Sequence, residues 1–237
     1  DLTKAIDYYT KSLKIHEGIR NKTGIAVCLY NIGILYKHLS ENNKALDYYT
    51  KSLKVYEEIG DKNGIANSLN YIGLIYGDQG DYGRAIYYLT KSLKTQDEIK
   101  NKQGIAHSMV NIGAIYQEQG DYAKAMVYYT KSLKIFEELE DKNGIARSIN
   151  NIGIIYKYQG DLSKALDYYT KSLKILEDQE DKKGIANSLM NIGSIYKEQG
   201  DYAKAMVYYT KSLKIDEELG YKKGIAISLN SIANVYN

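Results

Sequence analysis

Apolar side chains recur along this chain at the spacing of one helical face. In residues 61–80 they stand four, three and four residues apart, at Ile65, Leu69, Ile72 and Tyr76. This is the period of an amphipathic helix with one buried stripe. Asp61 is suited to begin the helix, because its carboxylate can accept hydrogen bonds from the unpaired amides of the first turn. Gly80 is suited to end it in a left-handed conformation, as are its equivalents except Ser40. We call this predicted element helix A.

Residues 81–100 carry a second stripe of the same period. Asp81 is the predicted N-cap, and the buried positions follow at Ala85, Tyr88, Leu89, Ser92, Leu93 and Ile99. We call this element helix B. Each helix is expected to span roughly 17–19 residues. The connecting turns are short, so neighbouring helices should run antiparallel.

The pair of helices repeats every forty residues without insertion or deletion. The segment Thr-Lys-Ser-Leu-Lys begins at Thr10, Thr50, Thr90, Thr130, Thr170 and Thr210. A fixed period of this length is typical of a solenoid, in which each unit buries its apolar face against its neighbours. We therefore predict an all-α chain of twelve helices, from a helix B at Asp1 to a helix A at Asn237. Residues 1–237 are expected to form a single array of about six units, as a fragment of a longer protein.

A glycine in the middle of helix A recurs in five copies, at Gly33, Gly73, Gly113, Gly153 and Gly193. Glycine costs about 1 kcal/mol relative to alanine inside a helix. An alanine recurs early in every helix B, as at Ala85. We therefore predict that two helix backbones approach closely at these small residues.

The combined pattern N-I-G-x-I-Y-x-x-Q-G-D-Y-x-K-A-x-x-Y-Y-x-K-S-L-K-I resembles the tetratricopeptide repeat over the whole chain. The common repeat has about 34 residues and a proline after helix B, whereas this one has forty residues and no proline. The longer variant is similar to repeats in Pins-type polarity adaptors, kinesin light chains and arrays fused to bacterial signalling enzymes. The resemblance implies a right-handed α-solenoid of antiparallel helix pairs, a superhelix whose A helices line a concave groove that binds peptides.

In that family, the groove is reached from positions six, three and two before the mid-helix glycine, and one and four after it. The copies of this chain diverge at most of these positions, whereas residues 118–135 are identical to residues 198–215. Variation on one face of a constant frame is what a recognition surface requires. The candidate peptide-binding residues are Asn67, Asn70, His107, Asn111, Arg147, Asn150, Asn151, Lys157, Asn187, Asn191 and Lys197.

Asparagine recurs two residues before the glycine, at Asn31, Asn111, Asn151 and Asn191. An amide has both donors and an acceptor, so it can pair with a peptide backbone in either direction. It can equally bond the backbone of the adjacent repeat, and the sequence leaves both interpretations open. Asn70, Asn150 and Asn230 are better candidates for ligand contact, because their position is not asparagine in every copy.

The charge is nearly balanced, with 32 basic and 29 acidic residues and a net charge of +3. This favours neither nucleic acid nor a membrane as a partner. His107, Arg147, Lys157 and Lys197 form a mildly basic patch on the predicted groove, which suits an acidic peptide unless Glu118 and Glu198 neutralise it. The lysine row of helix B, such as Lys51 and Lys54, has glutamates at helical spacing. We interpret that row as the solvent-exposed surface on the helix B side of the array, with RNA binding as the alternative.

The sequence contains no recognisable catalytic or metal-binding pattern. Its three histidines, His16, His38 and His107, are too far apart in the repeat to share a metal ion. The single cysteine, Cys28, has no histidine at an activating spacing and is expected to be a small buried residue. We therefore predict no enzyme, no cofactor and no metal. A lone cysteine and the lack of a long apolar run fit a cytoplasmic location.

The resulting hypothesis is a non-catalytic scaffold for protein–protein interaction, such as a signalling adaptor. It would bind a peptide or a partner segment along the A helices, and the basic patch suits an acidic one. The first alternative is a structural spacer or a self-assembling rod, in which half-units at the two ends stack head to tail. The second alternative is weak nucleic-acid binding by the lysine-rich back.

Overall fold

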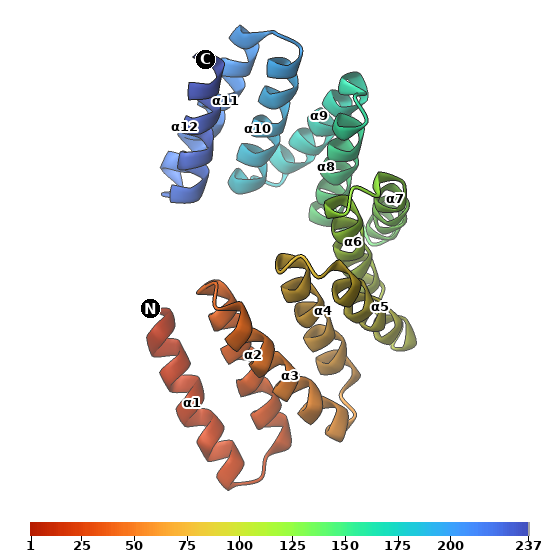
Figure 1. The fold of residues 1–237 in the computed structure, drawn as a ribbon, viewed down its shortest axis with the longest axis vertical. Helices are drawn as coiled ribbons and strands as arrows, with labels where there is room; N and C mark the ends of the chain where they lie inside the picture. Colours follow the sequence, from red (N-terminus) through yellow and green to blue (C-terminus); the bar gives the residue numbers. More distant parts are fainter. Residues whose placement is uncertain (237) are drawn as a thin grey trace. The chain divides into compact units, whose positions relative to one another are not determined.

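The computed structural model describes residues 1–236, and this part of the chain forms twelve α-helices (Figure 1). Odd-numbered helices correspond to helix B and even-numbered helices to helix A. Most have 17 residues, as α4 does, in agreement with the predicted length. The helices are α1 (Leu2–Gly18), α2 (Lys22–His38), α3 (Asn42–Ile59), α4 (Lys62–Asp78), α5 (Tyr82–Glu98), α6 (Lys102–Glu118), α7 (Tyr122–Glu138), α8 (Lys142–Tyr158), α9 (Leu162–Asp178), α10 (Lys182–Glu198), α11 (Tyr202–Glu218) and α12 (Lys222–Tyr236).

The helices begin at the predicted capping residues. The Asp61 side chain accepts a hydrogen bond from the Gly64 amide at 3.1 Å, which satisfies one donor of the first turn of α4. Asp81 does the same for the Arg84 amide of α5, at 3.0 Å. The other capped A helices follow the same rule, with acceptors at Asn21, Asn101, Asp141 and Asp181.

Each turn contains one residue in the left-handed conformation. Gly80 has a φ of 76°, and Ser40, the predicted exception, adopts the same conformation with a φ of 60°. The turns from helix B to helix A use non-glycine residues in most copies, at Arg20, Lys100, Glu140 and Glu180. A Schellman-type hydrogen bond helps to hold each such turn, for example from the Asn21 amide to the His16 carbonyl at 2.9 Å.

The chain divides into two compact units, Asp1–Asp121 with α1 to α6, and the residues from Tyr122 onward with α7 to α12. Within each unit, every helix packs against the next one in the chain. The core of the first unit includes Ala45, Tyr49, Ile72 and Ile75. The core of the second includes the residues at the same repeat positions, Ala165, Tyr169, Ile192 and Ile195.

The predicted close approach at the mid-helix glycine is present, but its main partner is a side chain. A Cβ atom on Gly193 would lie 2.6 Å from Cε1 of Tyr209, four residues after Ala205, the recurring alanine of helix B. A Cβ on Gly73 would lie 2.7 Å from Cγ of Leu89 and 3.1 Å from the Ala85 carbonyl oxygen. The glycine therefore makes room chiefly for a large core side chain, and less for a second backbone.

A second set of glycines covers a buried position that sequence analysis missed. A Cβ on Gly64 would lie 2.3 Å from the Tyr56 ring, and one on Gly144 would lie 2.2 Å from the Phe136 ring. Gln96 holds this helix B position in another copy and is only 5% exposed, although it was not among the predicted buried residues. The residue under the glycine varies through His16, Tyr56, Gln96, Phe136, Leu176 and Asp216. Variation is therefore not confined to the surface of helix A.

Candidate peptide-binding face

The variable positions of helix A lie at or near the surface. In α8, the spacing of Arg147, Asn150, Ile154 and Lys157 places them on one face, while Ile152 is buried on another. Val110 is an exception, because it is only 4% exposed at the position that Asn70 and Asn150 occupy in other copies. Among the predicted site residues, the exposed ones are Asn67, Arg147 and Asn187, and the half-buried ones are Asn70, His107, Asn111, Asn150, Asn151, Lys157, Asn191 and Lys197.

Asparagine pairs join successive A helices. We call the line along which two such helices meet a seam. At the α4/α6 seam, Nδ2 of Asn111 donates to Oδ1 of Asn70 at 2.8 Å. At the α8/α10 seam, Nδ2 of Asn191 donates to Oδ1 of Asn150 at 2.9 Å. Each asparagine thus bonds the neighbouring repeat, although the partner is a side chain and not the backbone. Each pair still has N–H donors and acceptor lone pairs to spare, so a ligand contact is compatible with this bond.

An ion pair crosses the α8/α10 seam beside the amide pair. Nζ of Lys157 lies 2.8 Å from Oε1 of Glu198 and donates to Oγ of Ser194 at 3.0 Å. The expected basic patch is therefore partly neutralised, as the nearby glutamate suggested. Lys197 has no ion-pair partner among residues 1–236. An equivalent ion pair, Lys37 with Asp78, crosses the α2/α4 seam.

Arg147 lies beside an aromatic ring of the preceding helix. Its Cζ atom is 6.0 Å from the centre of the Phe136 ring, at the outer limit of a cation–π contact. Although the side chain as a whole is exposed, partial burial of the guanidinium lowers its pKa, and the Asp141 carboxylate opposes that effect. An arginine stays charged despite such a shift, so it retains its ability to bind an anion.

The α2/α4 seam is aromatic, whereas the α4/α6 and α8/α10 seams carry amide pairs. The ring centres of Tyr30 and Tyr71 are 5.7 Å apart in an edge-to-face contact. Both rings also contact the buried Tyr49, at 5.5 Å and 5.0 Å. Burial, followed by the neighbouring Tyr71, raises the pKa of both Tyr30 and Tyr49 above the ordinary tyrosine value. The predicted site residues omitted this cluster, although tyrosine at a position that is asparagine in most copies was a signal for it.

Two surface hollows within residues 1–236 lie at turns and not on these seams. One of about 550 Å³ opens at the turn between α4 and α5, where Asp81 and Arg84 bond each other. Another lies at the turn that contains Ser40. Neither includes a predicted site residue, and both are lined by turn residues. These hollows therefore give no independent support to the predicted face.

Two searches of the described residues bear on other kinds of function. Within residues 1–236, no group of three or more His, Cys, Asp or Glu side chains is placed to hold a metal ion. No helix in the same range combines the length and apolar character that crossing a membrane requires. Cys28 is buried, as predicted, and its Sγ donates to Oγ of Ser12 at 3.5 Å.

Comparison with known proteins establishes the family. Profiles described as tetratricopeptide repeat match residues 1–58, 28–98, 100–178 and 186–219. The chain therefore belongs to the tetratricopeptide repeat family, and the resemblance seen in the sequence is confirmed. No curated protein sequence gives a significant match to the chain.

Solved structures share the helical-repeat fold at low sequence identity. BtubC from P. vanneervenii is 20% identical, with a TM-score of 0.75 and 93% of each chain covered. A Rap protein complexed with Competence and Sporulation Factor is 18% identical, with a TM-score of 0.72, covering 99% of this chain and 70% of that one. Aspartyl phosphate phosphatase F from Bacillus subtilis is 16% identical, with a TM-score of 0.74, covering 98% and 65%. These similarities support the all-α repeat fold.

Proposed function

We propose that this chain is a non-catalytic scaffold that binds an extended segment of a partner protein along the exposed faces of its A helices. The family supports an interaction role in general, and the Rap protein structure was obtained as a complex with Competence and Sporulation Factor. The particular face and the kind of partner are our inference.

The observation that carries the proposal is the contrast between positions that vary and positions that do not. Core positions such as Ala165 and Ile192 hold the same residue types as their equivalents Ala45 and Ile72. The half-buried seam positions instead hold tyrosine, asparagine, methionine or serine in different copies. Their amides keep donors and acceptors that can pair with an extended backbone. Exposed residues beside these amides, such as Arg147 and Asn187, can then select particular side chains of the partner.

A peptide that binds the wild-type chain is first selected from a displayed library of random sequences, and it serves as the probe. A selected peptide is then titrated against a triple variant, Arg147→Ala, Asn150→Ala and Asn187→Ala, by isothermal calorimetry. We expect at least a tenfold loss of affinity, because about 1.4 kcal/mol of lost contacts already produces that change. Helicity by circular dichroism should stay at the wild-type level, because Arg147 and Asn187 are exposed and Asn150 is only half-buried.

A matched variant on the back of the same unit controls for general effects of charge. Lys171 and Lys174 lie on α9 and are exposed, and Lys171 forms an ion pair with Asp167 of its own helix. Replacing both lysines by alanine should leave the affinity unchanged. Equal loss in the two variants, or no loss in the triple variant, would show that the peptide does not bind this face.

The chemistry of the partner is also part of the proposal. Arg147 and Lys197 favour a peptide with acidic residues opposite the second unit, since Lys157 is already paired with Glu198. Affinity for such a peptide should fall as salt rises. A cytoplasmic location is proposed with it, because the single cysteine Cys28 is buried and has no disulfide partner.

End-to-end self-association is a second candidate, because the first and last described helices expose large apolar side chains. Ile15 and Ile19 lie at and just after the end of α1 and are each 65% exposed, and Ile227 of α12 is 48% exposed. Light scattering over a concentration series separates the two functions. A mass that grows with concentration supports assembly, and a constant monomer mass excludes it.

A further inference from the structure

Several tyrosine rings on this chain have a cation of the same chain over one face. The guanidinium Cζ of Arg84 lies 4.2 Å from the centre of the Tyr76 ring, and Nζ of Lys164 lies 5.0 Å from the Tyr156 ring. Such contacts stabilise because the positive charge faces the negative face of the ring. The same arrangement recurs at Tyr8, Tyr36, Tyr48, Tyr87, Tyr168, Tyr196, Tyr208 and Tyr221.

The cluster of Tyr30, Tyr49 and Tyr71 differs from these pairs. Among residues 1–236, no lysine or arginine lies over any of its three rings. The nearest cation along α2, Lys37, is paired with Asp78 across the same seam. Tyr30 and Tyr71 are half-buried, so each ring keeps a part that faces solvent. The rings therefore have aromatic surface that no cation of the described chain occupies.

The Tyr49 hydroxyl provides a second and independent observation. Tyr49 is 0% exposed, and its Oη atom has no hydrogen-bond partner within residues 1–236. A buried hydroxyl without a partner costs roughly 1–3 kcal/mol. The ring that carries it is stacked on Tyr71 and touches Tyr30, so the hydroxyl belongs to the same cluster. A ligand that supplies a hydrogen-bond donor here would remove that cost.

We propose that the cluster of Tyr30, Tyr49 and Tyr71 is a subsite for an arginine side chain of the bound partner segment. The planar guanidinium would insert between the rings of Tyr30 and Tyr71, and one N–H group would donate to Oη of Tyr49. The two half-buried rings part by a change of side-chain rotamer, which is common on binding. This inference rests on the proposed function, since it assigns one residue type to a position on the same partner.

Arginine fits both observations best. Lysine is also a cation with N–H donors, but it lacks a planar group that stacks between two rings. A carboxylate would meet the negative faces of the rings, which repel it. An aliphatic side chain would cover the rings but leave the Tyr49 hydroxyl without a partner. The guanidinium stacks on aromatic faces and has five N–H donors in one plane. It therefore satisfies the rings and the hydroxyl together.

The test uses two small probes that differ in charge. The probes are N-acetyl-L-argininamide and the neutral, nearly isosteric N-acetyl-L-citrullinamide. Each is titrated into the full chain, whose tyrosine rings are isotopically labelled, and the ring signals are followed by NMR. We expect argininamide to shift the signals of Tyr30, Tyr49 and Tyr71, and to bind about two- to fivefold more tightly than citrullinamide. Equal binding of the two probes, or equal shifts at the already covered Tyr36, overturns the proposal.

Variants separate the rings from the hydroxyl. Tyr30→Leu keeps an apolar side chain but removes the ring, and it should weaken argininamide about two- to fivefold. Tyr49→Phe removes only the hydroxyl and should weaken it about two- to tenfold. Tyr36→Leu is the matched control, because Lys44 already covers that ring. Unchanged binding in Tyr49→Phe contradicts the hydrogen bond even if Tyr30→Leu perturbs folding.

The peptides selected on the wild-type chain distinguish this subsite from the wider function. If they bind, lose affinity in the Arg147, Asn150 and Asn187 variant, and ignore Tyr30→Leu, the arginine subsite is wrong and the scaffold function stands. If no peptide is selected but argininamide still binds at the three tyrosines, the subsite stands and the scaffold function fails.

Discussion

The α2/α4 seam and the α8/α10 seam occupy the same place in the repeat but hold different chemistry. In the first, the rings of Tyr30 and Tyr71 meet edge to face at 5.7 Å. In the second, the amides of Asn150 and Asn191 share a hydrogen bond of 2.9 Å. The core tyrosine below each seam is the same, Tyr49 or Tyr169. A contact between tyrosine rings and a hydrogen bond between side-chain amides are thus alternative ways to join successive A helices.

This difference shows that the seam residues of each repeat have two roles. It ties each A helix to the next one, and it also presents side chains to solvent. A substitution at Asn150 therefore affects both a helix contact and a candidate ligand contact. Stability and binding have to be measured on the same variant before a loss of affinity is assigned to recognition.

The largest expected effect concerns the layer that the two seams share. Tyr49→Ala and Tyr169→Ala should each lower the free energy of unfolding by about 3–5 kcal/mol, because each empties a fully buried aromatic position. Urea denaturation followed by circular dichroism measures this. Tyr87, which is 53% exposed, is the matched control and should change stability by no more than about 0.5 kcal/mol when replaced by alanine. A large difference between the two core tyrosines would contradict a common frame.

The next effect measures the two seams themselves. Double-mutant cycles to alanine on Asn150 with Asn191, and on Tyr30 with Tyr71, should each give a coupling energy of about 0.5–1.5 kcal/mol. The amide pair is joined by one hydrogen bond and the tyrosine pair by one ring contact. The two coupling energies should therefore be similar. Additive single effects at either pair would mean that the pair does not join its helices.

Alkaline pH should distinguish the seams by their buried phenols. Burial, with Tyr71 as the next cause, raises the pKa of Tyr30 and Tyr49 above the ordinary value of 10.0. Above that pH the unfolded chain releases these protons while the folded chain retains them. Stability is therefore complete below about pH 10 and falls as the pH rises further. The double variant Tyr30→Phe and Tyr49→Phe should reduce this fall, as measured by urea denaturation across pH.

The α8/α10 seam should be less affected at alkaline pH, because Tyr169 is the tyrosine with a raised pKa there. Burial is again the main cause. Tyr169→Phe should accordingly reduce the alkaline loss by less than the double variant does. Lysine deprotonation contributes equally to the alkaline loss of stability in both variants, so it cancels when the two are compared. An equal or larger reduction in Tyr169→Phe would contradict the assignment of two shifted phenols to the aromatic seam.

The smallest effect is expected at the ion pair beside the amides. Lys157 and Glu198 are partly exposed, with side-chain exposures of 26% and 44%. Replacing Lys157 by Met should cost about 0.2–1 kcal/mol, and the cost should shrink at high salt. Thermal unfolding at low and high ionic strength measures this. A cost that is independent of salt would point to packing of the aliphatic stem and not to the charge.

Much of the fold was predictable because it depends on local and repeated signals. Caps such as Asp61, the apolar stripe and the left-handed turn at Gly80 are each written in a few adjacent residues. The forty-residue period then fixed the number of helices. The buried position at Gln96 was missed because its residue is polar in that copy. It follows Ser92 by four residues and Leu89 by seven, so the helical period already places it on the buried face.

The candidate site was predictable only in outline. The positions that vary were visible in the sequence, and the described ones lie at or near the surface apart from Val110. Their partners were not, because the bond between Asn150 and Asn191 joins residues 41 apart on separate helices. The aromatic cluster was overlooked since Tyr30 and Tyr71 come from different repeats and Tyr49 from the helix B between them. Which side chains meet across a seam follows from packing and not from spacing alone.

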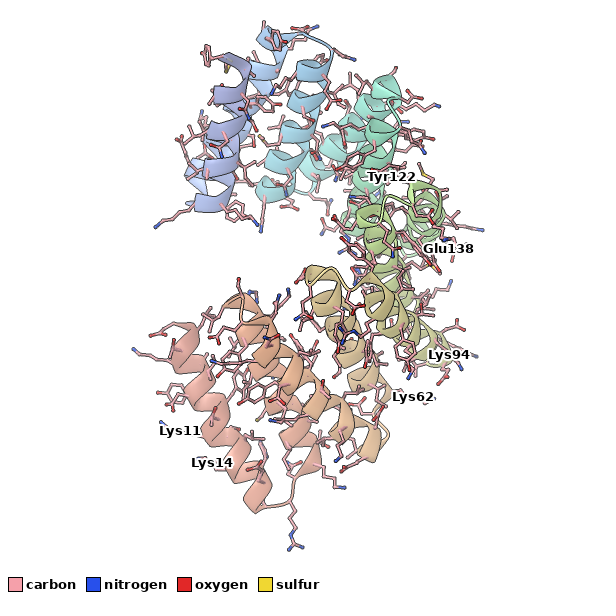
Figure 2. The ribbon with its side chains drawn as sticks, viewed as in Figure 1. Lys11, Lys14, Lys62, Lys94, Tyr122 and Glu138 are labelled. Carbon is pink, nitrogen blue, oxygen red and sulfur yellow. The ribbon has the colours of Figure 1, made fainter. Side chains whose placement is uncertain are left out.

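A structure of the chain bound to a selected peptide tests whether the variable face of the A helices is the recognition surface. We expect the peptide to contact Asn187 and Arg147, and its backbone to bond the amides of Asn150 or Asn191. Figure 2 shows the alternative surface, where Lys11 and Lys14 extend from the side of α1 that faces away from α2. A peptide seated on that lysine row, with the seam residues untouched, would contradict the proposed recognition surface.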